Sequence, residues 1–206
     1  MSVAADPVPV NQRRRIAVLR GLGLFLLAPV LLAAPRWGFE GAGHEALEVL
    51  GLALLLVGVG GRVWSILYVG ARKNRRLVTE GPYSLTRNPL YLFSTIAATG
   101  IGLMIGAVAY GILVGGTVGL VLWMTARMER DFLRASFDDY DAYAAEVPFF
   151  LPRPTGYRTG REVTFDAAVL TRNLRDALVF LAFIPLVEVL DLAHASGWLP
   201  QLIQLP

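Results

Sequence analysis

The sequence contains no cysteine and only two histidines, His44 and His194, which lie far apart along the chain. The missing thiols exclude disulfides, thiolate catalysis and cysteine-ligated metal sites. Two isolated imidazoles are too few for a histidine-based metal centre or a catalytic triad. We therefore interpret both histidines as structural residues and expect no bound metal.

Charge is also scarce. Charged residues make up 17% of the 206 residues, whereas hydrophobic residues make up 55%, and the mean hydropathy is +0.53. Charges gather in clusters that leave long uncharged runs, which is typical of an integral membrane protein. The net charge of +3 arises from basic clusters at the ends of these runs, which favours contact with anionic lipid headgroups over nucleic acid.

The apolar runs predict an all-α fold, a polytopic helical bundle with about five transmembrane helices, formed by residues 1–206 as a single membrane domain. The first run is as long as a span and no small-residue cleavage site follows it, so we expect it to be retained rather than removed as a signal peptide. The predicted spans are residues 16–34, 46–69, 90–107, 110–126 and 178–198.

Two features of these spans have more than one interpretation. Arg62 in the second span either contacts a partner inside the bundle or extends toward the basic side of the membrane. The last run is free of charge only between Asp176 and Glu188. We favour a fifth span over a re-entrant or interfacial helix, because Glu188, Asp191 and His194 share one helical face that can point into the bundle.

A polar, turn-rich segment, residues 77–91 (LVTEGPYSLTRNPLY), separates the second and third spans. We call it the polar segment. Pro89 suits the first turn of the third span, with Asn88 as its N-cap. The third and fourth spans are joined by almost no loop and are rich in glycine, which predicts a closely packed antiparallel pair. After the fourth span, apolar residues at three- and four-residue steps predict an amphipathic helix over residues 129–146, broken near Asp138.

Three basic clusters determine the expected orientation. They lie at residues 13–15, 72–76 and 127–175, with two predicted spans between successive clusters. By the positive-inside rule all three lie in the cytoplasm, and so do the N-terminus and the polar segment. The composition, rich in Ala, Gly, Arg and Leu, indicates a bacterial source, which makes the inner membrane the expected location.

The sequence LVTEGPYSLTRNPLYLF, followed by ERDFLRASFDDYDAYAAEVPFFLP, resembles the isoprenylcysteine carboxyl methyltransferase family of membrane enzymes. The related phospholipid methyltransferases share the pattern more loosely. The resemblance covers residues 58–152. There are two departures: Arg130 replaces the second acid of the family's acidic pair, and Asp138 replaces a glycine.

The resemblance implies a methyltransferase that binds S-adenosylmethionine (SAM) in a cytosolic region formed by residues 72–89 and 127–161. It also implies a lipidic acceptor that enters from the bilayer, and it assigns Arg87 and Glu129 to catalysis. A carboxylate such as Glu129 suits the ammonium group of SAM, while Arg87 or Asn88 suits its carboxylate, and Arg127 or Arg87 suits an acidic acceptor. The implied cofactor contacts are Tyr68, Arg75, Arg76, Leu77, Val78, Tyr83, Asn88, Pro89, Leu90, Tyr91 and Glu129, and the implied substrate contact is Arg127.

The sequence leaves the acceptor open between an isoprenylcysteine or isoprenoid carboxylate and the amine of a phospholipid headgroup. An amine must lose a proton before it is methylated, a role for Glu129, Asp131 or a tyrosine. The alternative enzyme is an NADPH-dependent membrane reductase of the sterol type. Its signature would place Asn at Leu90 and an acid near Ser94, and neither is present. The other alternative is a non-enzymatic membrane scaffold.

Overall fold

The computed structural model of this chain describes residues 41–70 and 76–200, together with residues 21, 31, 33–35 and 203–205. The predicted first span at residues 16–34 lies almost entirely outside the described residues, and so does the basic run at residues 72–75. The prediction of a retained first span therefore stays a prediction.

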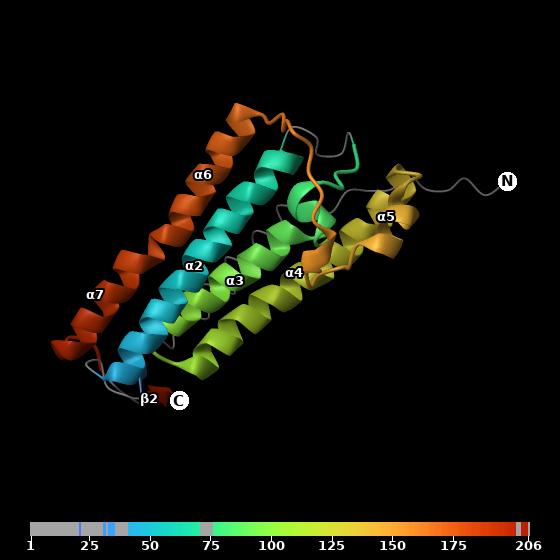
Figure 1. Cartoon of the computed structure of the whole chain (residues 1–206). Helices are drawn as coiled ribbons and strands as arrows, with labels where there is room; N and C mark the ends of the chain where they lie inside the picture. Colours follow the sequence, from blue (N-terminus) through green and yellow to red (C-terminus); the bar gives the residue numbers. More distant parts are fainter. Residues whose placement is uncertain are drawn as a thin grey trace.

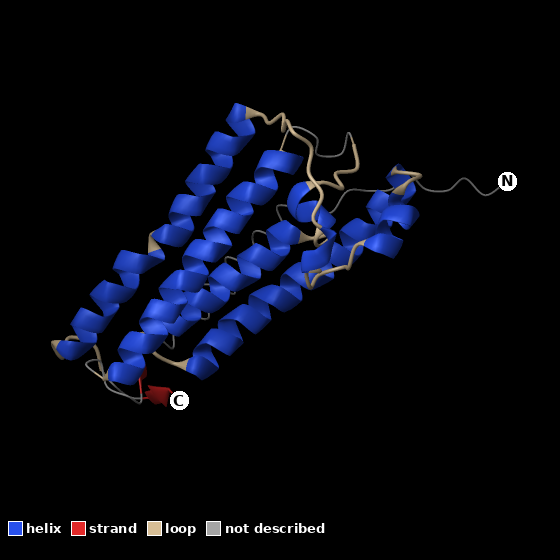
Figure 2. Cartoon of the chain, viewed as in Figure 1, coloured by secondary structure: helices blue, strands red, loops and turns tan. Residues whose placement is uncertain are grey.

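Six helices form the described part of the fold, and they confirm the predicted all-α class (Figures 1 and 2). They are α2 (Ala42–Val69), α3 (Pro89–Met104), α4 (Val108–Ser136), α5 (Tyr140–Glu146), α6 (Ala167–Leu181) and α7 (Phe183–Ala195). Two 3₁₀ turns are present at Gly81–Ser84 and Pro154–Gly156. A minimal parallel ladder joins β1 (Ala33–Pro35) to β2 (Ile203–Leu205).

The long helices lie side by side in the order α6, α2, α3, α4, and α7 continues the line of α6 (Figure 1). Three of the described helical stretches are long and apolar enough to cross a bilayer: α2, α4, and the nearly continuous pair α6–α7 over Ala167–Ala195. Helix α3 has only 16 residues, so it extends about 24 Å and is shorter than a hydrocarbon core of about 30 Å.

Two predicted boundaries are wrong. Helix α4 runs without interruption from Val108 to Ser136, through the position where we expected the fourth span to end and a separate helix to begin, because residues 120–136 contain neither glycine nor proline. The predicted break near Asp138 is confirmed. The last helical stretch begins at Ala167 rather than residue 178, because the Asp166 carboxylate accepts hydrogen bonds from the N–H groups of Ala168 and Val169.

Glycines allow the backbones of α2 and α3 to approach closely. A Cβ atom added to Gly51 would lie 2.6 Å from the carbonyl oxygen of Gly100, and one added to Gly58 would lie 2.6 Å from Ala97. Small residues at a helical interface permit this approach in membrane bundles. By contrast, nothing lies within 4 Å of a Cβ added to Gly60 or Gly116.

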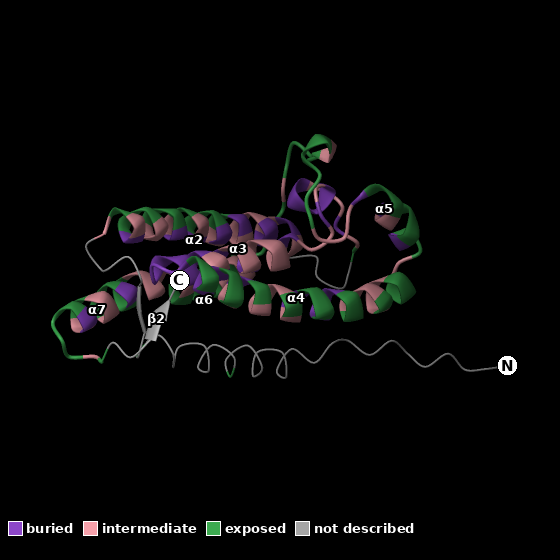
Figure 3. Ribbon diagram, turned by 90° about the horizontal axis from the view of Figure 1, so that it is seen from below, coloured by how far each residue is buried: buried purple, intermediate pink, exposed green. Residues whose placement is uncertain are grey.

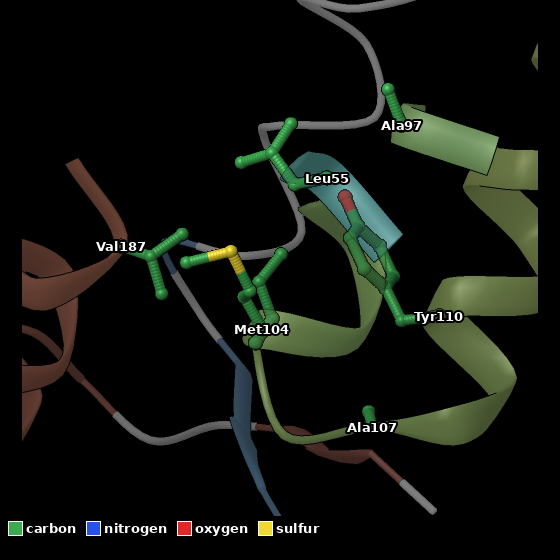
Figure 4. Close-up of a cluster of buried hydrophobic side chains, with 7 residues drawn as sticks. Leu55, Ala97, Met104, Ala107, Tyr110 and Val187 are labelled. Atoms are coloured by element: carbon green, nitrogen blue, oxygen red, sulfur yellow. The ribbon is translucent and has the colours of Figure 1, made fainter. Parts of the chain in front are cut away.

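One of three clusters of buried apolar residues lies at the end of the bundle away from the polar segment, and the other two lie at the polar segment itself. Figure 4 shows Met104 pointing toward Val187, with Leu55 and Tyr110 next to it. Exposed residues cover much of the outer faces of the helices (Figure 3), including Ile112 of α4 at 67% exposure, as expected for surfaces that face lipid.

Polar side chains connect α2 to its neighbours. Arg62 donates to Ser94 Oγ of α3 and its guanidinium lies 5.2 Å from the Phe180 ring centroid of α6, so it contacts partners inside the bundle. His44 Nε2 lies 3.1 Å from a carboxylate oxygen of Asp191 in α7. The expectation that three polar residues of the last span point inward is met by Asp191 and by buried His194, whereas Glu188 is exposed.

We expect Gly100→Ala to lower the free energy of unfolding by about 1–3 kcal/mol. Its new Cβ would lie 2.5 Å from the carbonyl oxygen of Gly51 and 2.6 Å from the backbone nitrogen of Leu55, so the helices must separate. Thermal unfolding of the detergent-purified protein measures the change. Gly116→Ala, the same change at a position with open space, is the control and should not destabilise. Equal midpoints for the two variants would contradict the packing described here.

Candidate functional site

The polar segment begins with a tight turn at Gly81. Its φ of 61° lies in the left-handed region that favours glycine, and an added Cβ would collide with the Tyr68 ring. The Ser84 hydroxyl donates to the Gly81 carbonyl at 2.6 Å, and the Gly81 N–H donates to the Arg158 carbonyl at 2.7 Å. The turn is thus fixed against both α2 and the chain that follows α5.

Residues 148–153 run alongside the polar segment, and hydrogen bonds in both directions connect the two. The N–H groups of Arg87 and Arg153 donate to the carbonyls of Pro148 and Leu85, each at 2.9 Å. The Thr86 hydroxyl donates to the Phe150 carbonyl at 2.9 Å, and Asn88 Nδ2 donates to the Phe149 carbonyl at 2.8 Å. Neither segment has regular secondary structure there, so each satisfies polar backbone groups of the other.

Helix α3 starts at the predicted residue, but the predicted side-chain hydrogen bond that would cap it is not formed. Pro89 occupies the first turn and Asn88 the N-cap position, yet Asn88 forms no side-chain cap. The predicted side-chain capping is therefore wrong. The physical reason is that the Asn88 amide donates to the Phe149 carbonyl in place of accepting from the first turn of α3.

A cavity of about 170 Å³ lies where the polar segment meets α4 and α5. It opens beside a larger groove of about 990 Å³, and the two share Arg76, Leu77, Phe137 and Tyr143. Most of the predicted site residues line the cavity: Arg76, Leu77, Val78, Tyr83, Arg87, Asn88, Pro89, Leu90, Tyr91 and Glu129. Two segments distant in sequence thus form one site.

Three predicted residues are not placed in the cavity wall. The hydroxyls of Tyr68 and Thr159 share a hydrogen bond of 2.8 Å, so the Tyr68 ring supports the turn at Gly81 from behind. Arg127 is exposed on α4, with its guanidinium 4.7 Å from the Trp123 ring centroid. Arg75 lies outside the described residues.

Eight other residues, which are not among the implied cofactor, catalytic and substrate contacts, also line the cavity. They are Val69, Ala126, Arg130, Phe132, Leu133, Phe137, Tyr140 and Tyr143. Most lie on the α4 face that carries Glu129, or on the start of α5 just beyond it. The three- and four-residue spacing from Ala126 to Tyr140 is the signal that identifies them, once α4 is known to continue past residue 126.

The charges of the cavity are unevenly distributed. Among the described residues that line it, Glu129 is the one carboxylate, and the Tyr91 hydroxyl donates to it at 2.8 Å. Three guanidinium groups also line it, those of Arg76, Arg87 and Arg130. Arg130 forms an ion pair with Asp131 at 2.8 Å, whereas Arg87 Nε is buried with no hydrogen-bond partner among the described residues. An unmade bond at a buried donor is costly, so Arg87 points to an absent acceptor.

The buried tyrosines act as donors. Burial raises the pKa of Tyr83 well above its usual value, and Tyr143, Tyr91 and Glu129 nearby raise it further. Burial likewise raises the pKa of Tyr143, whose hydroxyl donates to the Tyr83 carbonyl at 2.7 Å. Because a raised pKa keeps each phenol protonated at neutral pH, neither tyrosine is a general base there.

Comparison with known proteins identifies one family and two relatives. The phospholipid methyltransferase family model matches residues 47–140, which include nearly all of the cavity wall. The cobalt-zinc-cadmium resistance protein CzcN of Cupriavidus metallidurans is 34% identical, over 94% of this chain and 89% of its own length. The nickel-cobalt-cadmium resistance protein NccN of Alcaligenes xylosoxydans xylosoxydans is 29% identical, over 98% of this chain and 96% of its own length. No solved structure gives a significant match.

The family match extends from α2 to the first residue of α5 and so contains both parts of the cavity, the polar segment and the Glu129 face of α4. Residues 47–140 of this chain therefore belong to the phospholipid methyltransferase family, and three of the described helical stretches are long and apolar enough to cross a membrane.

Proposed function

We propose that this protein is a SAM-dependent methyltransferase that transfers a methyl group to a lipidic acceptor at the membrane. The observation that carries the proposal is that one aromatic-walled cavity is lined by both the Glu129 carboxylate and Arg87, whose buried Nε has no hydrogen-bond partner among the described residues. A zwitterionic amino-acid group requires these two charges, one for its ammonium and one for its carboxylate.

SAM fits the residues that are present. Glu129 would accept from the ammonium group and Arg87 would donate to the carboxylate. The Asn88 amide already donates to the Phe149 carbonyl, so we assign the carboxylate to Arg87 rather than to Asn88. Tyrosine and phenylalanine rings along the cavity offer faces for adenine and for a cation. Bound SAM would supply an electrophilic methyl group on a sulfonium.

The chain's own contribution to the reaction is alignment and exclusion of water. A carboxylate acceptor needs no base. An amine acceptor must lose a proton, and Glu129 is the carboxylate placed to receive it, since Asp131 is exposed and paired with Arg130. The raised pKa values of Tyr83 and Tyr143 keep both phenols protonated, so neither is suited to take this proton. The acceptor group remains either a carboxylate or a headgroup amine.

We further propose that the cavity faces the cytoplasm of a bacterial inner membrane. The described arginines lie at the cavity end of the helices or, for Arg62, within two turns of that end of α2. The described residues at the opposite end, 41–50, 104–110 and 190–200, contain neither lysine nor arginine. This asymmetry supports the orientation expected from the positive-inside rule.

The names of the two relatives refer to resistance against cobalt, zinc, cadmium and nickel. Within the part of the chain that the structure describes, no group of three or more His, Cys, Asp or Glu side chains is placed to hold a metal ion. We therefore build the proposed function on the aromatic-walled cavity and not on a metal centre.

Calorimetric titration with SAM tests the cofactor assignment. We expect the detergent-purified protein to bind SAM, and Glu129→Gln to weaken binding by at least about tenfold, because a charge-assisted hydrogen bond contributes about 1.5–3 kcal/mol. Glu45→Gln, the same change on the exposed first turn of α2, is the matched control and should bind SAM as the wild type does. Binding of NADPH without binding of SAM would contradict the proposal and favour the reductase.

A second test concerns the contact between the polar segment and residues 148–153. Asn88→Asp keeps the shape of the side chain but removes the N–H that donates to the Phe149 carbonyl, so we expect weaker SAM binding and a lower midpoint of thermal unfolding. Asn173→Asp is the control, because Asn173 Nδ2 also donates to a backbone carbonyl, that of Val169 in α6. Its SAM affinity should be unchanged. Wild-type affinity in Asn88→Asp would show that this bond does not position the site.

A further inference from the structure

Two aromatic rings flanked by two arginines form a line of contacts from the cavity to the outer face of α4. The Arg87 guanidinium lies 5.3 Å from the Phe149 ring centroid. Phe149 meets Trp123 edge to face, with centroids 6.5 Å apart and planes at 86°. The Arg127 guanidinium then lies 4.7 Å from the Trp123 centroid. We call these four residues the arginine–aromatic ladder.

The two ends of the ladder lie in different surroundings. Arg87 lines the cavity, where its Nε is buried without a partner among the described residues. Trp123 is 37% exposed on α4, and its neighbours Met124 and Met128 are 54% and 59% exposed. On a membrane helix such exposed apolar residues face lipid, and a tryptophan followed by an arginine is typical of the membrane–water interface. The ladder therefore connects the interface with the cavity.

We propose that the arginine–aromatic ladder is the entrance for the acceptor, and that it selects a lipid whose headgroup carries a net negative charge. Arg127 and Trp123 would receive the headgroup at the interface, and Phe149 would lie along its path to the cavity, where Arg87 holds the carboxylate of the cofactor. The inference rests on the proposed function, since it names the substrate class of that site.

The chemistry of the four side chains favours this occupant. A guanidinium binds a carboxylate or phosphate through paired N–H donors, and the ring faces keep each guanidinium in place by cation–π attraction. No acidic side chain forms an ion pair with Arg127 among the described residues. A zwitterionic headgroup would place its own cation against the Arg127 guanidinium. The arrangement thus favours a net anionic lipid over a zwitterionic one.

Tryptophan fluorescence in reconstituted vesicles tests the entrance separately from catalysis. The probes are phosphatidylglycerol and phosphatidylcholine with brominated acyl chains, which quench nearby indoles, and the Trp123→Phe variant identifies the Trp123 signal by difference. We expect the anionic lipid to quench Trp123 at about three- to tenfold lower mole fraction than the zwitterionic lipid, since one arginine near a surface contributes on the order of 1 kcal/mol. Arg127→Gln should remove this preference, and Arg127→Lys should keep part of it.

Arg161→Gln is the matched control, because Arg161 is exposed at the same end of the molecule but lies outside the ladder and both cavities. It should keep the preference, and millimolar inorganic phosphate should not abolish it. Equal quenching by the two lipids, or a preference that survives Arg127→Gln, would overturn the proposal that the ladder is the entrance for the acceptor. SAM calorimetry on the same variants distinguishes the two proposals, because Arg127→Gln should bind SAM normally even if the proposed entrance is wrong.

Discussion

The site depends on the hydrogen bonds between residues 85–88 and residues 148–153. Two irregular segments, separated by α3, α4 and α5, satisfy each other's polar backbone groups at the end of an apolar bundle. Neither segment is helix or strand at these residues, so without this contact their backbone N–H and C=O groups would lose these hydrogen-bond partners. The contact places Arg87 beside Phe149 and brings the polar segment against the Glu129 face of α4. The cavity therefore forms at the end of the α3–α4 hairpin where these two segments meet.

The helices supply the rigid part of this arrangement. Close backbone contact at Gly51 and Gly100 brings α2 against α3, and α4 continues well beyond the span predicted from its hydropathy. That continuation carries Glu129, Phe132 and Leu133 into the cavity wall. The short break at Phe137 then turns the chain into α5, whose Tyr140 and Tyr143 form the remaining wall. Burial raises the pKa of Tyr143, so this wall donates hydrogen bonds and does not remove protons.

Sequence reasoning identified the parts of the site that carry distinctive chemistry. The Gly-Pro turn, Arg87, Asn88 and Glu129 stand out because polar residues are rare in an apolar chain, and their order resembles a family pattern. The sequence places Leu133, Phe137 and Tyr143 on a helix that can meet the polar segment, but it does not show that they line a cavity, because an amphipathic stripe predicts a buried face without showing what it faces. The Asn88 side chain was misassigned for a related reason: its partner, the Phe149 carbonyl, lies 61 residues away, and local capping rules do not include such partners. Helix α4 continues past the predicted end of the fourth span, because hydropathy falls at Arg127 although helix propensity does not.

The absence of cysteine from the chain permits a direct test of whether SAM occupies this cavity. Leu133→Cys places the only thiol in the cavity wall, and Ala135→Cys places it on the exposed side of the same helix. The measurement is the rate at which a small methanethiosulfonate reagent modifies each thiol, with and without SAM. At SAM concentrations of about ten times Kd, we expect modification at position 133 to slow by about tenfold and modification at position 135 to be unchanged. SAM binding without protection of the thiol at position 133 would show that the cofactor binds elsewhere and would contradict the assignment of this cavity.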